Sequence, residues 1–247
     1  MSTTDVLPRH EAQALEAFVR GVPWGELWRR RDEPFDVGRY DDLVARRLDG
    51  EPLAYLIGST AFYGIEIACG PGVLVPRPET EILVDVALRL IADVPRPTVI
   101  DIGTGTGCVA LAIAAHRPDA TVYATESSGE AAAWAERNLT GSSAQLVRGD
   151  LFADCPAADL VVSNPPYVED GAVLPADVSR EPSEALFAGP EGLDVIDRII
   201  DGLGPHRAVA IEIGTPAQAA HVASRLGGAT VGNDLTGRPR VVSKRWA

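Results

Sequence analysis

The segment Val161–Tyr167 carries the clearest chemical signal in the chain, because an apolar strand pattern runs directly into Asn164-Pro165-Pro166-Tyr167. Proline fixes φ and lacks a backbone N–H, so the strand must end at this point. The Asn164 side-chain carbonyl and the Pro165 backbone carbonyl could each accept one hydrogen of an NH2 group. The Tyr167 ring offers a flat face to a planar amide, guanidine or base. The motif therefore predicts a site that holds a planar, NH2-bearing group.

A second signal is the glycine-rich loop Gly103-Thr104-Gly105-Thr106-Gly107, which lies between a strand pattern and a helix pattern. Glycines at such a turn let the backbone approach a ligand closely. A dinucleotide fingerprint would have its third glycine at Cys108, so the loop departs from the pattern for a pyrophosphate. Asp101, just before the loop, is an anion that suits the ammonium end of S-adenosylmethionine. The alternative interpretation is a tight strand-to-helix turn without a ligand.

Two further acids follow neighbouring strand patterns. Glu126 comes 23 residues after Gly103, where a carboxylate can accept hydrogen bonds from both ribose hydroxyls. Asp150 follows the next strand pattern and could accept from an adenine amino group. Taken alone, Glu126 would be interpreted as a surface residue and Asp150 as a turn residue. With the glycine-rich loop they predict a nucleoside site.

These signals together indicate methyl transfer to nitrogen. An amide nitrogen is a poor nucleophile because its lone pair is delocalised into the carbonyl group. Attack on a sulfonium methyl places positive charge on that nitrogen, and fixed acceptors at Asn164 and Pro165 would oppose the charge. Placing the nitrogen in line with the methyl group removes much of the entropic barrier. We expect Asn164, Pro165 and Tyr167 to be the catalytic residues; a plain proline-rich loop is the alternative.

The elements that must position these residues alternate between strand and helix from Glu79 onward, which predicts a doubly wound, mostly parallel α/β sheet of the Rossmann-like methyltransferase type. A final pair of strand patterns could form an antiparallel hairpin at the sheet edge, giving seven strands. The strand patterns are Thr98–Ile102, Thr121–Ala124, Leu146–Val147, Leu160–Ser163, Val209–Ile213, Ala229–Val231 and Arg240–Ser243. The helix patterns are Glu79–Ala92, Gly107–His116, Ser128–Asn138 and Gly192–Leu203.

The first third of the chain has a different character. Residues 9–48 show helical spacing broken by prolines into about three short helices. Two short runs, 55–57 and 62–67, resemble the strands of a β-hairpin separated by Gly58-Ser59-Thr60. We therefore expect a small helical domain at 1–50, a β-hairpin linker at 51–78 and the methyltransferase domain at 79–247.

Composition limits the classes of partner. The formal net charge of −13 over 247 residues is the wrong sign for gripping a DNA or RNA duplex. Arg29-Arg30-Arg31 could bind nucleic acid but is more typical of a solvated helix end. The cysteines are widely spaced, which predicts neither a metal site nor disulfides. No run is long and apolar enough to span a bilayer, and Met1–Asp5 lacks the start of a secretory signal, so we expect a cytoplasmic protein away from membranes.

The chain over residues 43–247 resembles the protein-(glutamine-N5) methyltransferases that modify the Gly-Gly-Gln glutamine of peptide-chain release factors. The Asn-Pro-Pro-Tyr motif alone is shared with adenine N6 methyltransferases, whereas the Pro-Arg-Pro-Glu-Thr-Glu segment and the C-terminal pattern are more specific. The segments that carry the resemblance are the glycine-rich loop, Arg47–Tyr55, Val75–Glu81, Asn164–Tyr167, Glu181–Leu186, Gly189–Leu193, Ile211–Gly214 and Asp234–Arg240.

The resemblance implies a role for each segment. The glycine-rich loop would cradle S-adenosylmethionine, Glu126 its ribose, and Asp150 with Leu151 its adenine, leaving S-adenosylhomocysteine as the product. The motif residues, Pro166 included, would hold the glutamine amide, with Asn164 also near the cofactor. Arg77 would belong to a lid-like segment that ends at Glu81 and binds substrate; a simpler reading has Thr80 capping the next helix.

Two departures from the family pattern leave alternatives open. The N-terminal helical part at 1–50, which the resemblance implies is a substrate-recognition domain, is shorter than usual, and Glu126 stands where Asp is commoner. The leading expectation is methylation of a release factor. A small-molecule acceptor (an amino acid, a guanidine or a biosynthetic intermediate) would use the same site. DNA adenine methylation and a catalytically silent cofactor-binding scaffold are the remaining alternatives.

Overall fold

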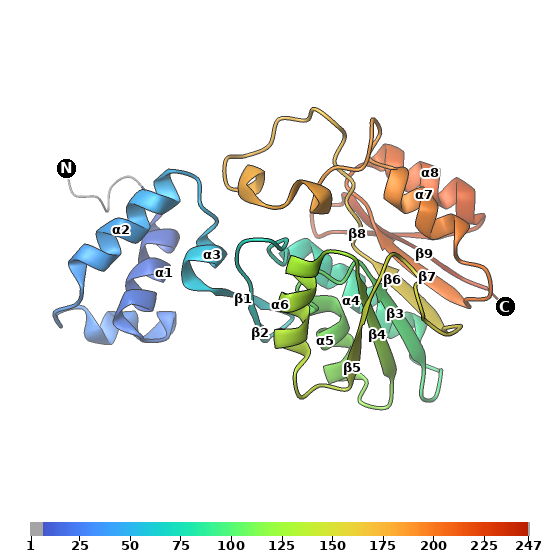
Figure 1. Cartoon of the computed structure of the whole chain (residues 1–247), viewed down its shortest axis with the longest axis horizontal. Coiled ribbons are helices and arrows are strands. Elements are labelled where there is room, and N and C mark those ends of the chain that lie inside the picture. The colour runs from blue at the N-terminus through green and yellow to red at the C-terminus, as the bar shows by residue number, and fades with distance from the viewer. Residues whose placement is uncertain (1–6, 247) are drawn as a thin grey trace.

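The computed structural model describes residues 7–246, so the Met1–Asp5 segment considered above lies outside the described residues. The N-terminal part is helical, as the sequence predicts (Figure 1). Its helices pack around a small core made by Leu15, Tyr40, Leu43, Val44 and Leu56. Their bounds are α1 Arg9–Arg20, the 3-10 helix η2 Trp24–Arg30, α2 Val37–Leu48 and α3 Leu53–Ile57.

A β-hairpin follows, but not between the strands predicted from the sequence. The run 55–57, expected to be its first strand, belongs to α3, which ends at the left-handed Gly58 (φ 86°). The hairpin instead joins β1 (Ser59–Phe62) to β2 (Ile65–Ala68). Its turn residues, Tyr63 and Gly64, both have positive φ (52° and 76°), as the tight turns that suit strand twist require. The short apolar run could not distinguish a helical turn from a strand.

The main domain contains a seven-stranded sheet in the order β5-β4-β3-β6-β7-β9-β8. The five strands from β3 to β7 are parallel to one another, and β9 runs antiparallel to both β7 and β8. This architecture confirms the predicted doubly wound sheet and its C-terminal hairpin. The strand bounds are β3 Thr98–Ile102, β4 Thr121–Glu126, β5 Ala144–Arg148, β6 Leu160–Ser163, β7 Ala208–Glu212, β8 Thr230–Asn233 and β9 Pro239–Arg245.

Helices cover both faces of this sheet (Figure 1). Alternate strand residues enter two separate cores: Val99 packs with residues of α4, α5 and α6, whereas Ile100 packs with residues of α7 and α8. None of the helices within residues 7–246 is long and apolar enough to cross a membrane. The bounds are η3 Pro78–Thr80, α4 Glu81–Leu90, α5 Cys108–His116, α6 Gly129–Leu139, η4 Val178–Arg180, η5 Ser183–Ala185, α7 Asp194–Asp201 and α8 Pro216–Leu226.

Helix α8 is the one long element that the sequence patterns missed. It begins with a capping box: the Thr215 side chain accepts from the Gln218 backbone N–H, and the Gln218 side chain accepts from the Thr215 N–H. Pro216 occupies its first turn. Thr-Pro-x-Gln is a recognisable helix start, so the sequence did contain the signal.

The N-terminal helices are tied to the long segment that follows β6. The Arg47 guanidinium of α2 pairs with Glu11 of α1 at 2.7 Å and with Asp177 at 3.1 Å. Arg180 of η4 pairs with Asp49, just after α2, at 2.6 Å. Because this segment begins at the Asn-Pro-Pro-Tyr motif, the helical part contacts the same loop that leads out of the site.

Phe62 tests whether the hairpin is part of the main core. Its ring is 1% exposed and packs in the cluster formed with α4 and α5. We expect Phe62→Ala to lower the free energy of unfolding by about 3–5 kcal/mol, the usual cost of removing a buried ring. Urea denaturation measures this change. Val173→Ala, at a side chain that is 97% exposed, serves as the control and should leave stability unchanged. Equal midpoints for the two variants would contradict the assignment of the hairpin to the core.

Candidate active site

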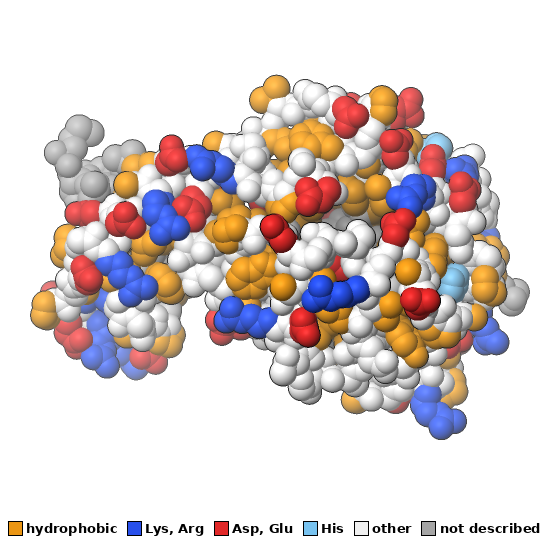
Figure 2. All heavy atoms as spheres, in the orientation of Figure 1, with side chains coloured by type: hydrophobic (Ala, Val, Ile, Leu, Met, Phe, Trp, Pro, Cys, Tyr) orange, Lys and Arg blue, Asp and Glu red, His pale blue; other side chains and the backbone are white. Residues whose placement is uncertain are grey.

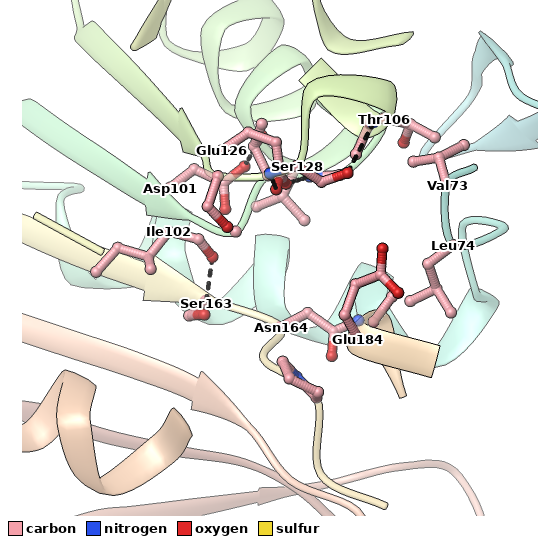
Figure 3. A pocket seen from close by; sticks show the side chains of 18 of the residues that line it. Val73, Leu74, Asp101, Ile102, Thr106, Glu126, Ser128, Ser163, Asn164 and Glu184 are labelled. Atoms are coloured by element: carbon pink, nitrogen blue, oxygen red, sulfur yellow. Dashed lines mark hydrogen bonds between the residues drawn. The ribbon is translucent and has the colours of Figure 1, made fainter. Parts of the chain in front are cut away.

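Three strands end side by side at the edge of the sheet where the sequence signals meet. Ile102 of β3 pairs in register with Thr125 of β4 on one side and with Ser163 of β6 on the other. The residues at or just beyond these ends line one cleft, with Glu126 and Asp101 on one side and Asn164 on the other (Figure 3). The predicted residues that line it are Arg77, Asp101, Gly103, Thr104, Gly105, Thr106, Glu126, Asp150, Leu151, Asn164 and Pro166. The fold therefore brings the two predicted halves of the site together.

The glycines of the loop have two different structural roles. Gly103, Gly105 and Gly107 all have positive φ (64°, 58° and 82°), which glycine adopts at little cost. A Cβ at Gly103 would meet no protein atom within 4 Å and would project into open space. A Cβ at Gly107 would lie 3.1 Å from Leu139 of α6, and Gly107 is absent from the cleft lining. Gly103 thus keeps room for a ligand, whereas Gly107 lets α5 and α6 pack closely.

Asp101 is a buried carboxylate at the base of this loop. Its Oδ2 accepts from the Thr104 hydroxyl at 2.6 Å and from the Ala110 backbone N–H of α5 at 3.1 Å. Burial raises the pKa of the Asp101 carboxyl to about 7, against the lowering effect of these two hydrogen bonds. The repulsion of Glu126 also raises this pKa. A cationic ligand group in the cleft would favour the ionised form.

Glu126 ends β4 with its carboxylate held in place from two sides. One oxygen accepts from the Gly105 N–H and the other from the Ser128 N–H, each at 2.9 Å. Ser128 in turn caps α6 by accepting from the Ala131 N–H. Each carboxylate oxygen can accept a further bond, so Glu126 is a fixed, two-point acceptor beside the glycine-rich loop.

Asp150 and Leu151 line the cleft beyond β5, next to a residue that the sequence did not single out. Arg198 of α7 donates to the Asp150 carboxylate and also lines the cleft. Asp150 is therefore already paired with a cation. Leu151 has a positive φ of 50°. Holding a bulky residue in this conformation costs about 1–3 kcal/mol, and residues held in this way are common at functional sites. Arg198 carries no local sequence signal, because its helix meets Asp150 only in the tertiary fold.

Asn164 is oriented by a partner from a distant segment. Its Nδ2 donates to the Thr80 hydroxyl oxygen at 3.0 Å, so its Oδ1 is left as the acceptor. The simpler reading of Thr80 as a helix cap is wrong, because Thr80 has helical φ and ψ and makes no side-chain cap hydrogen bond. The Ser163 hydroxyl donates to the Ile102 carbonyl at 2.8 Å, which fixes the strand end before Asn164.

Tyr167 and Pro165 are not among the residues that line the cleft. The Tyr167 ring packs against Gly214, where a Cβ would come within 2.7 Å of the ring. The Tyr167 hydroxyl donates to Glu212 at 3.3 Å, and its carbonyl accepts from the Gln218 side chain at 2.9 Å. Stacking of Tyr167 on a substrate thus stays a prediction, while its ring and hydroxyl already have partners within the protein.

Arg77 lines the cleft, and an ion pair that the sequence did not reveal holds it there. Its guanidinium donates to Glu181, whose other carboxylate oxygen accepts from the Val75 backbone N–H at 2.9 Å. The Glu181 side chain is 1% exposed. The segment before α4 is therefore fastened to the segment that follows the Asn-Pro-Pro-Tyr motif. In the sequence, Glu181 was marked only as part of a segment that carries the family resemblance, without a role, and its partner lies 104 residues away.

Comparison with known proteins agrees with this geometry. Residues 80–182 match the family model "Methyltransferase small domain", and residues 5–58 match "PrmC N-terminal domain". The release factor glutamine methyltransferase of Mycolicibacterium smegmatis is 40% identical, over 96% of this chain and 90% of its own length. The chain belongs to the release factor glutamine methyltransferase family. The Streptomyces coelicolor member is 43% identical, over 76% of this chain and 70% of its own length.

Solved structures with a similar fold include the hMettl16 catalytic domain in complex with the MAT2A 3′UTR hairpin 6, with a TM-score of 0.64 and 17% identity over 80% of this chain and 83% of that one. The human methyltransferase 10 domain containing protein has a TM-score of 0.55 and 18% identity, over 74% of this chain and 89% of its own. Both structures are similar to this chain in fold alone. Family membership makes this chain a methyltransferase that uses S-adenosylmethionine. The open space at Gly103 and the two-point acceptor Glu126 fit that nucleoside-bearing cofactor.

The Glu181 pairing gives a stability prediction. Glu181→Ala leaves the Val75 N–H and the Arg77 guanidinium without their acceptor, and we expect it to lower the free energy of unfolding by about 1–3 kcal/mol. Glu181→Gln keeps one acceptor oxygen and should cost less. Glu184→Ala, at an exposed carboxylate three residues further on, is the control. Chemical denaturation that finds Glu181→Ala as stable as Glu184→Ala would show that the pairing does not hold the two segments.

Proposed function

We propose that this chain transfers the methyl group of S-adenosylmethionine to the side-chain amide nitrogen of a glutamine, in the Gly-Gly-Gln motif of a peptide-chain release factor. The observation that carries the proposal is the orientation of Asn164. Its NH2 group is committed to Thr80, so its carbonyl oxygen is the group left to receive an amide hydrogen. That oxygen belongs to the same cleft as the glycine-rich loop and Glu126.

The cofactor would lie along the first half of the cleft. Gly103 to Thr106 would follow its methionine part, with Asp101 near the ammonium group. Glu126 would accept from the two ribose hydroxyls, since both of its oxygens are fixed by backbone N–H groups. Asp150 and Leu151 would border the adenine. When bound there, S-adenosylmethionine supplies a methyl group attached to a positively charged sulfur.

The protein's contribution to the reaction is positioning and charge stabilisation. Asn164 Oδ1 and the Pro165 carbonyl would each accept one N–H of the glutamine amide and turn its nitrogen toward the methyl group. Bond formation to the methyl carbon, with the carbon–sulfur bond breaking to leave neutral S-adenosylhomocysteine, would make the nitrogen positive, and these oxygens would stabilise that charge. The nitrogen then loses one proton to water and becomes the N5-methyl amide. No strong base is needed, because the protonated amide is a strong acid.

Two observations favour a protein acceptor over a small molecule or a nucleic acid. The N-terminal helices match the N-terminal domain model of the family, and residues 1–50 would serve as the recognition domain that contacts the release factor. The side chains on the face in Figure 2 mix both signs of charge and form no continuous basic surface for a phosphate backbone. A small-molecule acceptor would use the same chemistry without needing the helical domain.

Intact mass spectrometry of a recombinant release factor, incubated with this chain and S-adenosylmethionine, tests the proposal. We expect a gain of one methyl group that disappears when the Gly-Gly-Gln glutamine is replaced. No gain, with cofactor binding still measurable by calorimetry, would overturn the release-factor substrate and point to the small-molecule acceptor. Parallel incubations with free amino acids would then identify that class.

Asn164→Ala is expected to lower kcat by about 10²-fold or more, the usual loss when one oriented polar group is removed from an active site. Affinity for S-adenosylhomocysteine should change little, because Asn164 acts on the acceptor nitrogen. Asn233→Ala, at an exposed position of β8, is the matched control and should retain full turnover. Unchanged turnover in Asn164→Ala would rule out the mechanism.

Asp101 gives a pH prediction. Because its pKa in the protein is about 7, the carboxyl is largely neutral below that pH and ionised above it. A cationic ammonium favours the ionised form, so affinity for S-adenosylhomocysteine should increase as the pH rises from about 6 to about 8. Calorimetry over this range should find weaker and nearly pH-independent binding in Asp101→Asn. A variant with the same pH dependence as the native chain would place the ammonium elsewhere.

A further inference from the structure

Glu212 is a buried acid that none of the roles above uses. It is the last residue of β7, whose other members are Ala208, Val209, Ala210 and Ile211. The residue is 1% exposed, and its Oε2 is the one buried side-chain nitrogen or oxygen within residues 7–246 that has no hydrogen-bond partner. An incompletely paired carboxyl in such a place costs free energy that an apolar side chain would not. The strand needs no acid for its own packing.

The partners of Glu212 are the supports of the acceptor site. Its Oε1 accepts from the Tyr167 hydroxyl at 3.3 Å. The Thr80 hydroxyl lies close enough to the carboxyl to lower its pKa, and the same Thr80 oxygen accepts from Asn164 at 3.0 Å. One carboxyl thus accepts from Tyr167 and lies beside the hydroxyl that orients Asn164.

The hydroxyls of Tyr167 and Thr80 are the main groups with which the Glu212 carboxyl interacts. Arg240 of β9 lies near enough to lower the pKa of Glu212, but its guanidinium pairs with Asp234 at 3.0 Å. Burial raises the pKa of the Glu212 carboxyl to about 7, with Glu79 adding to the rise. The hydroxyls of Thr80 and Tyr167 oppose the rise, so both neighbours favour the ionised carboxylate.

We propose that Glu212 is a positioning residue for methyl transfer: it holds Tyr167 by its hydroxyl and, through Thr80, fixes the amide of Asn164 with its oxygen toward the acceptor nitrogen. The inference rests on the proposed roles of Asn164 and Tyr167. Glu212 itself touches neither cofactor nor substrate. Its effect is on the alignment of the acceptor, where a shift of about 1 Å can cost about 10²-fold in rate.

Glu212→Ala should lower kcat by about 10- to 100-fold, because Tyr167 loses its acceptor and Thr80 loses the carboxylate beside it. KM for the release factor and the Kd of S-adenosylhomocysteine should stay within about 3-fold of the native values, since neither the docking surface nor the cofactor groups change. Glu212→Gln retains an acceptor oxygen for Tyr167 and should recover most of the lost rate. Ser243→Ala, at a buried polar residue of the neighbouring strand β9, is the control with native kcat.

Tyr167→Phe separates alignment from simple loss of packing, because it removes only the hydroxyl. If Glu212 acts through this hydroxyl, the double variant Tyr167→Phe/Glu212→Ala should be no slower than Glu212→Ala alone. Rate losses that multiply would overturn the inference. A native kcat in Glu212→Ala, or an equal loss in Glu212→Gln and Glu212→Ala together with lost cofactor affinity, would also overturn it.

A readout without turnover keeps this test independent of the substrate assignment. The side-chain amide signals of Asn164 in ¹⁵N NMR spectra should shift in Glu212→Ala and stay in place in Ser243→Ala. If the native chain fails to methylate a release factor while these signals shift, the proposed function fails and the positioning role stands. Unmoved Asn164 signals would contradict the positioning role whatever the substrate.

Discussion

The register of three adjacent parallel strands is the constraint on which the site depends. Because Ile102 pairs with Thr125 on one side and Ser163 on the other, chain segments far apart in sequence end at one edge of the sheet. Cross-links maintain this alignment: the Thr104 N–H donates to the Thr125 carbonyl at 2.9 Å, and the Ser163 hydroxyl donates to the Ile102 carbonyl at 2.8 Å. A slip of one residue would separate the cofactor half of the cleft from the acceptor half.

The two halves are built in different ways. The cofactor half is built from two adjacent strands: Asp101 accepts from a backbone N–H of the helix after its own strand, and Glu126 accepts from backbone N–H groups of the loops after β3 and β4. The acceptor half is assembled from distant segments, since Asn164 depends on Thr80 and Arg77 depends on Glu181. The first half can therefore be preformed by the sheet alone. The second half requires that the segments before α4 and after β6 be docked together.

This difference explains how far the sequence could predict the structure. The doubly wound sheet, the glycine-rich loop and the gathering of Asp101, Glu126 and Asn164 follow from strand patterns and from the rule that ligands bind at carboxyl ends. Both predicted strands of the hairpin were wrong: the run 55–57 forms part of a helix, since a short apolar run suits either a helical turn or a strand, and the run 62–67 contains the turn between β1 and β2. The packing of Tyr167 on Gly214 and the pairing of Asp150 with Arg198 depend on tertiary contacts that no local pattern encodes.

The central claim is that one cleft aligns the methyl donor and a glutamine amide through Asn164. A crystal structure of this chain with S-adenosylhomocysteine and a release factor tests it most directly. We predict ribose hydroxyls bonded to Glu126, and a glutamine amide bonded to Asn164 Oδ1 and the Pro165 carbonyl with its nitrogen facing the sulfur. A nucleoside away from Glu126, or a glutamine amide bound elsewhere than at Asn164, would contradict the account.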